Sequence, residues 1–171
     1  IGGYLNFANS VEYILDVSDK NEFVFNADKF AKHIASLDPN VPVVVFGFTY
    51  ILFAQIIKPY TASILNFSLP KGSKLIHIGG WKKLENEKVT KEVFNEQTEK
   101  LFCLEKGNVI DIYGFTEQMG LNYPDCKCGY KHTSSYSEVI VRDPATRAVV
   151  PPGEVGVLEF VSPIPHSYPG N

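Results

Sequence analysis

SKLIHIGGWKKLENEKVTKEVFNEQTEKLFCLEKGNVIDIYGFTE (residues 73–117) decides the fold of this chain. Two short apolar runs, residues 73–80 and 108–114, flank a segment from 90 to 104 in which apolar side chains recur at helical spacing. All-apolar strands are typical of parallel sheets, because helices cover both faces of such a sheet. A strand, a helix and a second strand at this spacing predict a βαβ unit with a parallel sheet.

The residues upstream of this unit continue the same design. In VPVVVFGFTYILFAQII (41–57) the β-branched part predicts a strand that ends at Gly47, and the rest predicts a helix. Residues 21–26 alternate like a short strand, and the residues before them look helical. Asp28 is expected to cap a further helix, which Asp38-Pro39 would stop. We therefore expect the α/β class, with a partial parallel sheet and flanking helices.

The pattern changes after Gly120. NYPDCKCGYKH (122–132) is a loop rich in Cys and Gly, and two alternating runs follow it, residues 137–143 and 156–162. Turn residues around PPGEVG separate these runs, so they predict an antiparallel β meander.

Length, charge and cysteine count restrict the class of protein. A single domain of 171 residues buries roughly 70% of the surface of its unfolded chain, which is enough for a core. We expect one domain, with an α/β part over residues 1–120 and a Cys/His loop and β meander over 121–171. Lys and Arg number 16 against 19 Asp and Glu, a net charge of −3, so the chain lacks the basic footprint of a nucleic-acid-binding protein.

The sequence also bears on cellular location. It has no apolar run of about 18 residues, the length that a membrane span requires, and no signal-peptide pattern at its start. The three cysteines are an odd number, which favours a reducing compartment over a disulfide framework. No membrane span and a cytoplasmic location are therefore expected.

The residues after the last apolar run of the βαβ unit are candidates for a site, because ligands of open parallel sheets bind beyond the carboxyl ends of the strands. Tyr113 can offer an aromatic face to a base, and Gly114 lets a ligand approach the backbone. Thr116 can offer a hydroxyl to a phosphate, and Glu117 a carboxylate to a divalent metal. The same residues equally fit a strand end followed by a Thr N-cap and an acidic first helical turn.

YGFTE (113–117) resembles the tyrosine-glycine-x-threonine-glutamate motif of the adenylate-forming superfamily, which includes acyl-CoA synthetases, peptide-synthetase adenylation domains and luciferases. The resemblance implies that Tyr113 stacks on the adenine of ATP. It also implies that Thr116 contacts the α-phosphate and the acyl-adenylate as a catalytic residue. Glu117, the second catalytic residue by this resemblance, would help to hold Mg²⁺.

Two flanking segments resemble the same superfamily. IHIGGWKKL (76–84) resembles its double-glycine loop, whose backbone borders the adenine, which implies that Gly79 and Gly80 contact the nucleotide. Trp81 would flank the nucleotide or, alternatively, cover the strand end. PPGEVGVLEF (151–160) resembles the Gly-Glu-x-Gly turn and strand that follow the nucleotide motif.

A closer similarity joins HIGGWKKL, YGFTEQMGLNYPDCKCGYKH and SPIPHSYPG, which together resemble the acyl-protein synthetases of the bacterial bioluminescence fatty-acid reductase complex. The resemblance implies a ligase that uses ATP and Mg²⁺ to activate a carboxylic acid, chiefly a fatty acid, as its acyl-AMP. The acyl group would then pass to a thiol. CoA, a cysteine of the protein itself and an acyl-accepting reductase partner all remain open as acceptors.

The chain departs from the superfamily pattern at both ends. A Ser/Thr/Gly-rich phosphate loop should precede the βαβ unit, and nothing before Asp38 resembles one. In the superfamily, an acidic residue that binds the ribose and a small domain with a catalytic lysine follow the segment that SYPG resembles. Neither is found after SYPG in this sequence. We therefore expect this chain to be part of a larger adenylating domain and to be inactive by itself.

Cys126, Cys128 and His132 are candidate zinc ligands, since thiolates and imidazole are the ligands that zinc prefers. A structural site takes four ligands, so a fourth would come from elsewhere, for example Cys103 or His77. Phenylacetate-CoA ligases resemble this chain in carrying Cys and His in a zinc-holding loop at this place. The alternative is a surface loop with unligated thiols.

FGFTYILF (46–53) is the candidate acyl pocket, because it follows a buried strand. Gly47 would leave room for the acyl chain, and Phe48, Thr49 and Tyr50 would line the pocket. Ordinary core packing at the start of an aromatic helix explains each residue equally well.

Two other classes of function compete with the adenylating enzyme. One is a non-catalytic, zinc-stabilised interaction module that has kept the fold without the chemistry. The other is a nucleotide-binding oxidoreductase domain, which the sequence disfavours because no G-x-G-x-x-G follows any predicted strand.

Overall fold

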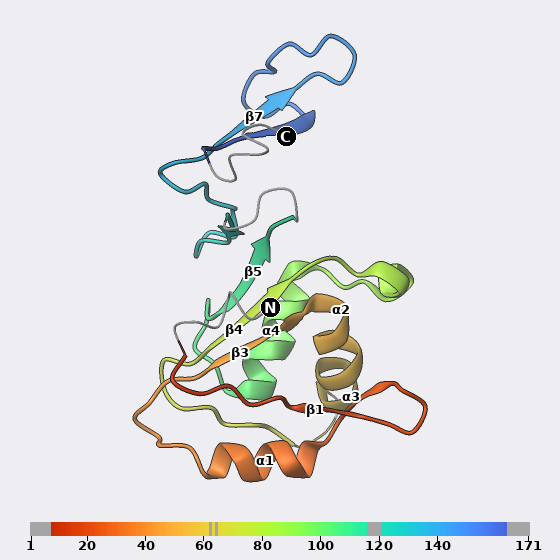
Figure 1. Ribbon diagram of the computed structural model, residues 1–171, viewed down its shortest axis with the longest axis vertical. Helices are drawn as coiled ribbons and strands as arrows, with labels where there is room; N and C mark the ends of the chain where they lie inside the picture. The colour runs from red at the N-terminus through yellow and green to blue at the C-terminus, as the bar shows by residue number, and fades with distance from the viewer. Residues whose placement is uncertain (1–7, 62, 64, 116–120, 164–171) are drawn as a thin grey trace.

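The computed structural model of the chain describes residues 8–61, 63, 65–115 and 121–163. Its centre is a four-stranded sheet in the order β3-β4-β5-β6 (Figure 1). The parallel strands are β3 (Val44–Phe48), β4 (Lys74–Ile78) and β5 (Val109–Tyr113), and β6 (Tyr123–Pro124) pairs antiparallel with β5. The predicted α/β class with a partial parallel sheet is confirmed.

The helices connect these strands as the βαβ pattern predicts. After β3 come α2 (Thr49–Leu52), a π-helical segment (Phe53–Ile57) and α3 (Lys58–Thr61) in direct succession. Between β4 and β5 lie a 3₁₀ helix (Lys82–Glu87) and α4 (Lys91–Phe102). No helix in the described ranges is both long and apolar enough to cross a bilayer.

Helix α4 begins and ends at recognisable residues. The Thr90 side chain accepts a hydrogen bond from the Val93 N–H at 3.3 Å, which caps the amino end. Cys103 ends the helix in the left-handed conformation, with φ 52° and ψ 40°, and its N–H donates to the Glu99 carbonyl. Such a left-handed residue is a common helix end, although glycine usually occupies it.

The first 40 residues differ in part from the sequence-based expectation. The predicted strand is present as β2 (Phe23–Phe25), but it pairs with β1 (Leu15–Val17), so the described residues before it form a hairpin arm rather than a helix. Helix α1 (Ala27–Ala35) is capped by Asn26, whose Oδ1 accepts from the Lys29 N–H at 3.0 Å, and not by Asp28. Asn and Asp both cap helices well, so the sequence alone does not distinguish Asn26 from Asp28 as the N-cap of α1.

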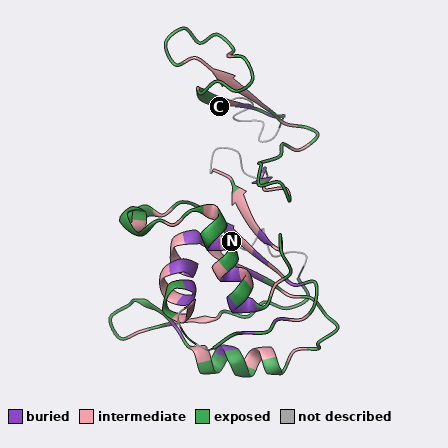
Figure 2. Cartoon of the chain, turned by 180° about the vertical axis from the view of Figure 1, so that it is seen from behind, coloured by how far each residue is buried: buried purple, intermediate pink, exposed green. Residues whose placement is uncertain are grey.

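The main core lies where the helices meet the strands, and Figure 2 shows most of the buried residues there. The inward strand residues Val45, Leu75 and Val109 belong to one buried cluster with side chains of α1, the α2–α3 segment and α4. Within it, Phe30 packs against Phe67 and Phe102, with ring centroids 5.1 and 6.1 Å apart. This cluster packs the helices against the three parallel strands.

A second, smaller core joins β6 to a separate hairpin. Strands β7 (Glu138–Arg142) and β8 (Val157–Val161) are antiparallel, as predicted, and lie beyond the carboxyl end of β5 (Figure 1). The buried residues of this core are Leu121, Tyr123 and Phe160, with Phe115 and Val139 packed against them.

Candidate functional site

The two sequence motifs that resemble nucleotide-binding segments meet at one edge of the sheet. Ile78 and Ile112 are partners in the parallel pairing of β4 and β5, so the double-glycine loop and Tyr113 follow at the same edge. A Cβ on Gly114 would lie 3.6 Å from the Ile78 Cδ1 and 3.0 Å from the Asn122 Oδ1. A side chain at residue 114 would therefore require the Asn122 side chain to shift by a few tenths of an ångström. Thr116 and Glu117, the predicted catalytic and Mg²⁺-binding residues, lie outside the described residues.

The Tyr113 side chain packs against the second core and remains partly exposed to solvent. Its ring stacks on Phe160 with centroids 5.8 Å apart and planes 20° apart, and it contacts Phe115 at 5.8 Å. The side chain remains 45% exposed. The exposed part of the ring is an aromatic surface of the kind that stacks on a flat base, and the stacking of Tyr113 on adenine stays a prediction.

The double-glycine loop offers its backbone rather than side chains. Gly79 has a φ of +86°, which glycine adopts without strain, and a Cβ there would lie 3.7 Å from Phe48. Apart from its chain neighbours, no heavy atom of the described residues lies within 4 Å of the Cβ position of Gly80. The Trp81 indole packs edge-on against Phe53 at 4.8 Å. Thus Trp81 covers the core, while the glycines leave open backbone beside Tyr113.

The candidate acyl pocket is partly filled by the chain itself. The space beside Gly47 is taken by the Leu52 side chain, whose carbons lie 3.0 to 3.3 Å from a Cβ built on the glycine. Phe48 stacks with Tyr50 at 6.3 Å, and the Lys82 ammonium lies 5.3 Å from the centre of the Tyr50 ring. Phe48 and Tyr50 thus stand near the double-glycine loop, whereas Gly47 serves the packing of α2.

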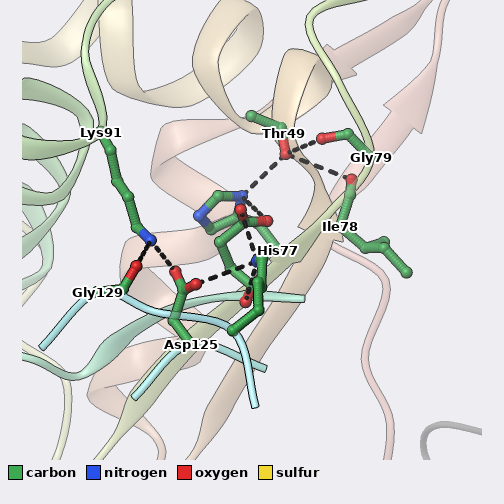
Figure 3. Close-up of polar contacts among 9 residues, drawn as sticks. Thr49, His77, Ile78, Gly79, Lys91, Asp125 and Gly129 are labelled. Atoms are coloured by element: carbon green, nitrogen blue, oxygen red, sulfur yellow. Dashed lines mark hydrogen bonds and ion pairs between the residues drawn. The ribbon is translucent and has the colours of Figure 1, made fainter. Parts of the chain in front are cut away.

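Thr49 does not line an open surface, since it is 4% exposed. Its Oγ1 lies 2.7 Å from the Gly79 carbonyl, 3.3 Å from the Ile78 carbonyl and 2.8 Å from His77 Nδ1 (Figure 3). The hydroxyl therefore ties the start of α2 to the end of β4.

His77, expected from the sequence only as a possible fourth zinc ligand, lies in the core beside the double-glycine loop. It is 5% exposed, and its ring packs against Phe94 at 4.6 Å. Its period-2 position in β4, facing inward like Leu75, is the signal that could have placed it in the core. Burial lowers the pKa of His77 from 6.5 to about 4, although the carboxylates of Asp111 and Asp125 oppose this shift.

Thr49, His77 and Asp111 do not form a nucleophilic triad. In a triad the nucleophile and the orienting carboxylate contact opposite nitrogens of the histidine. Here both lie at Nδ1, the Thr49 hydroxyl at 2.8 Å and the Asp111 carboxylate at 3.7 Å. The buried hydroxyl is also shielded from substrate, so the arrangement is suited to holding backbone and not to covalent catalysis.

A charged cluster connects this part of the sheet to the Cys/His loop. Lys131 pairs with Asp111 at 2.8 Å and with Asp125 at 3.2 Å, and Lys91 of α4 also pairs with Asp125. Lys91 further donates to the Gly129 carbonyl at 2.9 Å (Figure 3). The Asp125 side chain is 5% exposed, so two cations neutralise a nearly buried carboxylate and dock the loop.

The candidate zinc ligands do not converge in the structure. His132 interacts with Cys126, whereas Cys128 is exposed on the turn and Cys103 lies at the end of α4. Among the described residues no three His, Cys, Asp or Glu side chains are placed to hold one metal ion. The proposed fourth ligand, His77, is bonded to Thr49 instead. The structure thus gives a zinc site no support.

Cys126 nevertheless has an unusual setting for a thiol. The backbone N–H groups of Tyr130 and Cys128 stabilise its thiolate, His132 adds to this effect, and the pKa of Cys126 falls from 9.0 to about 7. Its backbone N–H donates to the Tyr130 carbonyl at 2.8 Å, which closes the turn.

Solved structures of adenylate-forming enzymes share this fold. The chain superposes on ATP-bound MatB from Rhodopseudomonas palustris with a TM-score of 0.54 at 17% identity, covering 81% of this chain and 25% of that one. An ATP-bound RpMatB-BxBclM chimera gives a TM-score of 0.55 at 17% identity with the same coverage. At this identity the likeness concerns the fold, and the chain spans about a quarter of the length of these structures. No curated protein matches the chain.

The sequence as a whole gives the more specific assignment. All of residues 1–171 match the protein family described as "Acyl-protein synthetase, LuxE". With the fold of an adenylate-forming domain and the double-glycine loop beside Tyr113, this chain belongs to the LuxE acyl-protein synthetase family.

Proposed function

We propose that this chain forms the adenine side of an ATP-dependent acyl-adenylating site, in a protein that activates a fatty acid and transfers it to a thiol. The observation that supports this most directly is the meeting of Tyr113 with the open backbone of Gly79 and Gly80 at the carboxyl ends of β4 and β5. Family membership supports the reaction class.

The roles follow from the chemistry of the groups present. The Tyr113 ring would stack on one face of the adenine, and the loop backbone would border its edge. By the family resemblance, Thr116 would contact the α-phosphate and Glu117 would hold Mg²⁺. The metal would neutralise the negative charge of the phosphates. The carboxylate of the fatty acid would attack the α-phosphorus, and pyrophosphate would leave. A thiol would then displace AMP from the acyl group.

The acceptor thiol and the partner are part of this proposal. A reductase protein, CoA and a cysteine of the protein itself each provide a thiol of suitable chemistry. The structure offers no feature that favours a zinc-stabilised interaction module, because the candidate ligands do not converge in the described part of the chain.

Calorimetric titration of the full-length protein with a non-hydrolysable acyl-AMP analogue and Mg²⁺ tests the site. We expect Tyr113→Ala to weaken binding about tenfold, which is the size of one base-stacking contact. Tyr136→Ala is the matched control, since Tyr136 is a similarly exposed tyrosine (53%) on the segment before β7. Glu117→Ala should weaken binding in a Mg²⁺-dependent way. Wild-type protein that binds neither the analogue nor ATP would disprove the proposal.

A further inference from the structure

We propose that Thr49 and His77 are positioning residues that set the conformation of the Gly79–Gly80 loop. As a role in nucleotide binding this rests on the proposed function, but as a statement about the loop it does not. Thr49 begins α2 and His77 lies in β4, so the pair connects two separate elements to the loop backbone.

The donor and acceptor pattern of this contact is fixed by chemistry. A carbonyl oxygen can only accept, so the single hydrogen of the Thr49 hydroxyl goes to the Gly79 carbonyl, 2.7 Å away. The contact of 2.8 Å between Thr49 Oγ1 and His77 Nδ1 then requires its hydrogen from the imidazole. His77 is therefore the neutral tautomer that carries its proton on Nδ1.

The surroundings of the ring favour the same tautomer. The Asp111 carboxylate lies 3.7 Å from Nδ1, where it attracts the N–H, and burial keeps the imidazole neutral at pH 7. His77 Nε2 is buried and has no hydrogen-bond partner among the described residues. Nε2 is unpaired in either neutral tautomer, so among the described residues the imidazole makes its hydrogen bond through Nδ1.

Two consecutive hydrogen bonds connect His77 to the backbone of the double-glycine loop. His77 orients the Thr49 hydroxyl, the hydroxyl holds the Gly79 carbonyl, and Gly79 adopts its φ of +86° with Gly80 open to solvent beside it. Neither side chain touches the nucleotide surface, since they are 4% and 5% exposed. Their effect on binding would be carried by backbone geometry alone.

The first readout is amide hydrogen exchange of residues 79–81 in the full-length protein. Thr49→Val keeps the shape of the side chain and removes the hydroxyl, so we expect exchange there to rise about tenfold, the effect of one buried hydrogen bond. Thr49→Ser should restore wild-type exchange. His77→Leu should resemble Thr49→Val, whereas His77→Asn, which keeps a donor near the Nδ1 position, should restore much of the protection.

Thr98→Val is the control for a general loss of stability. Thr98 is equally buried in α4, and its hydroxyl donates to the Phe94 carbonyl at 2.7 Å within the helix. We expect this variant to lose stability without faster exchange at residues 79–81. If Thr49→Val and Thr98→Val give the same exchange in the loop, the positioning role is wrong.

The second readout is nucleotide binding, which separates this inference from the proposed function. Thr49→Val should raise the KM for ATP about tenfold, because the loop backbone would border the adenine. Faster loop exchange in a protein that binds no nucleotide would support the positioning role and reject the proposed function. An unchanged KM for ATP in Thr49→Val with normal loop exchange would reject the positioning role alone.

Discussion

The α/β region and the hairpin region of this chain bury very different amounts of apolar surface. Among the described residues, the cluster beneath the parallel strands contains fourteen buried apolar side chains, and the cluster under β7 and β8 contains three. Tyr113 lies between them, at the end of β5 and stacked on Phe160 of β8. The Gly79–Gly80 loop of the candidate site thus belongs to the well-packed α/β region. The Tyr113 ring, in contrast, is supported by the smaller core of the hairpin region.

The largest effect is expected in the well-packed cluster. Phe102 is 0% exposed and contacts Phe30 and Phe67, so Phe102→Ala should lower the free energy of unfolding by about 3–5 kcal/mol. Leu158→Ala, at a half-exposed position of β8, should change it by less than about 0.5 kcal/mol. Denaturant unfolding followed by circular dichroism measures both. Equal effects would mean that the two regions do not differ as described.

The second effect concerns acid. Because burial lowers the pKa of His77 from 6.5 to about 4, the unfolded chain binds a proton more readily than the folded one. Stability should be full above pH 6.5 and fall as the pH drops toward 4, by about 3 kcal/mol in total for this group. The charged groups that face the ring are Asp111, Asp125, Lys91 and Lys131. Unfolding curves at several pH values should show a shallower slope in His77→Asn.

A smaller effect is expected in the charged cluster that connects the sheet to the Cys/His loop. Asp125→Asn removes the carboxylate that Lys91 and Lys131 share, and both lysines are about one-third exposed, so water replaces part of the loss. We expect a cost of about 1–2 kcal/mol with faster amide exchange at residues 125–132. Glu154→Gln, an exposed carboxylate in the turn before β8, serves as the control. Protection that persists in Asp125→Asn would contradict the docking role of the cluster.

The smallest effect tests the link between the sparse core and the site. Phe160→Ala should leave the unfolding midpoint of the α/β region unchanged, since Phe160 belongs to the other cluster. It should weaken binding of the acyl-AMP analogue about fivefold by loosening the Tyr113 ring, a fraction of one stacking contact. Val157→Ala on the same strand is the control, because that side chain is 43% exposed. Calorimetry distinguishes the two variants.

The βαβ order was predictable because it depends on local patterns. The apolar runs around β3, β4 and β5 are long enough to exclude a solvent-facing strand, and Thr90 caps α4 within the predicted boundaries. The hairpin was equally visible, since β7 and β8 each fall within a predicted alternating run. The part of the sheet that was missed is β6, whose two residues carry no periodic signal.

The site was predictable only as far as motifs reach. Tyr113, Gly79 and Gly80 were identified through resemblance, and the structure brings their elements together. Thr49 and His77 are 28 residues apart in the chain, so no sequence spacing indicates their contact. The contact of Gly47 with Leu52 is a second case that the sequence does not indicate, and the role of Gly47 in an acyl pocket stays a prediction. The contacts of Thr49, His77 and Gly47 depend on the tertiary structure, which the sequence motifs do not show.

The left-handed conformation of Cys103 has a practical consequence for thiol labelling. A residue with a Cβ is strained at φ 52°, and glycine is not, so Cys103→Gly should gain up to about 1 kcal/mol while it removes an exposed thiol. With Cys103 gone, the remaining thiols, Cys126 and Cys128, are both on the loop beside Lys131, so a spectroscopic probe on either would report how that loop moves.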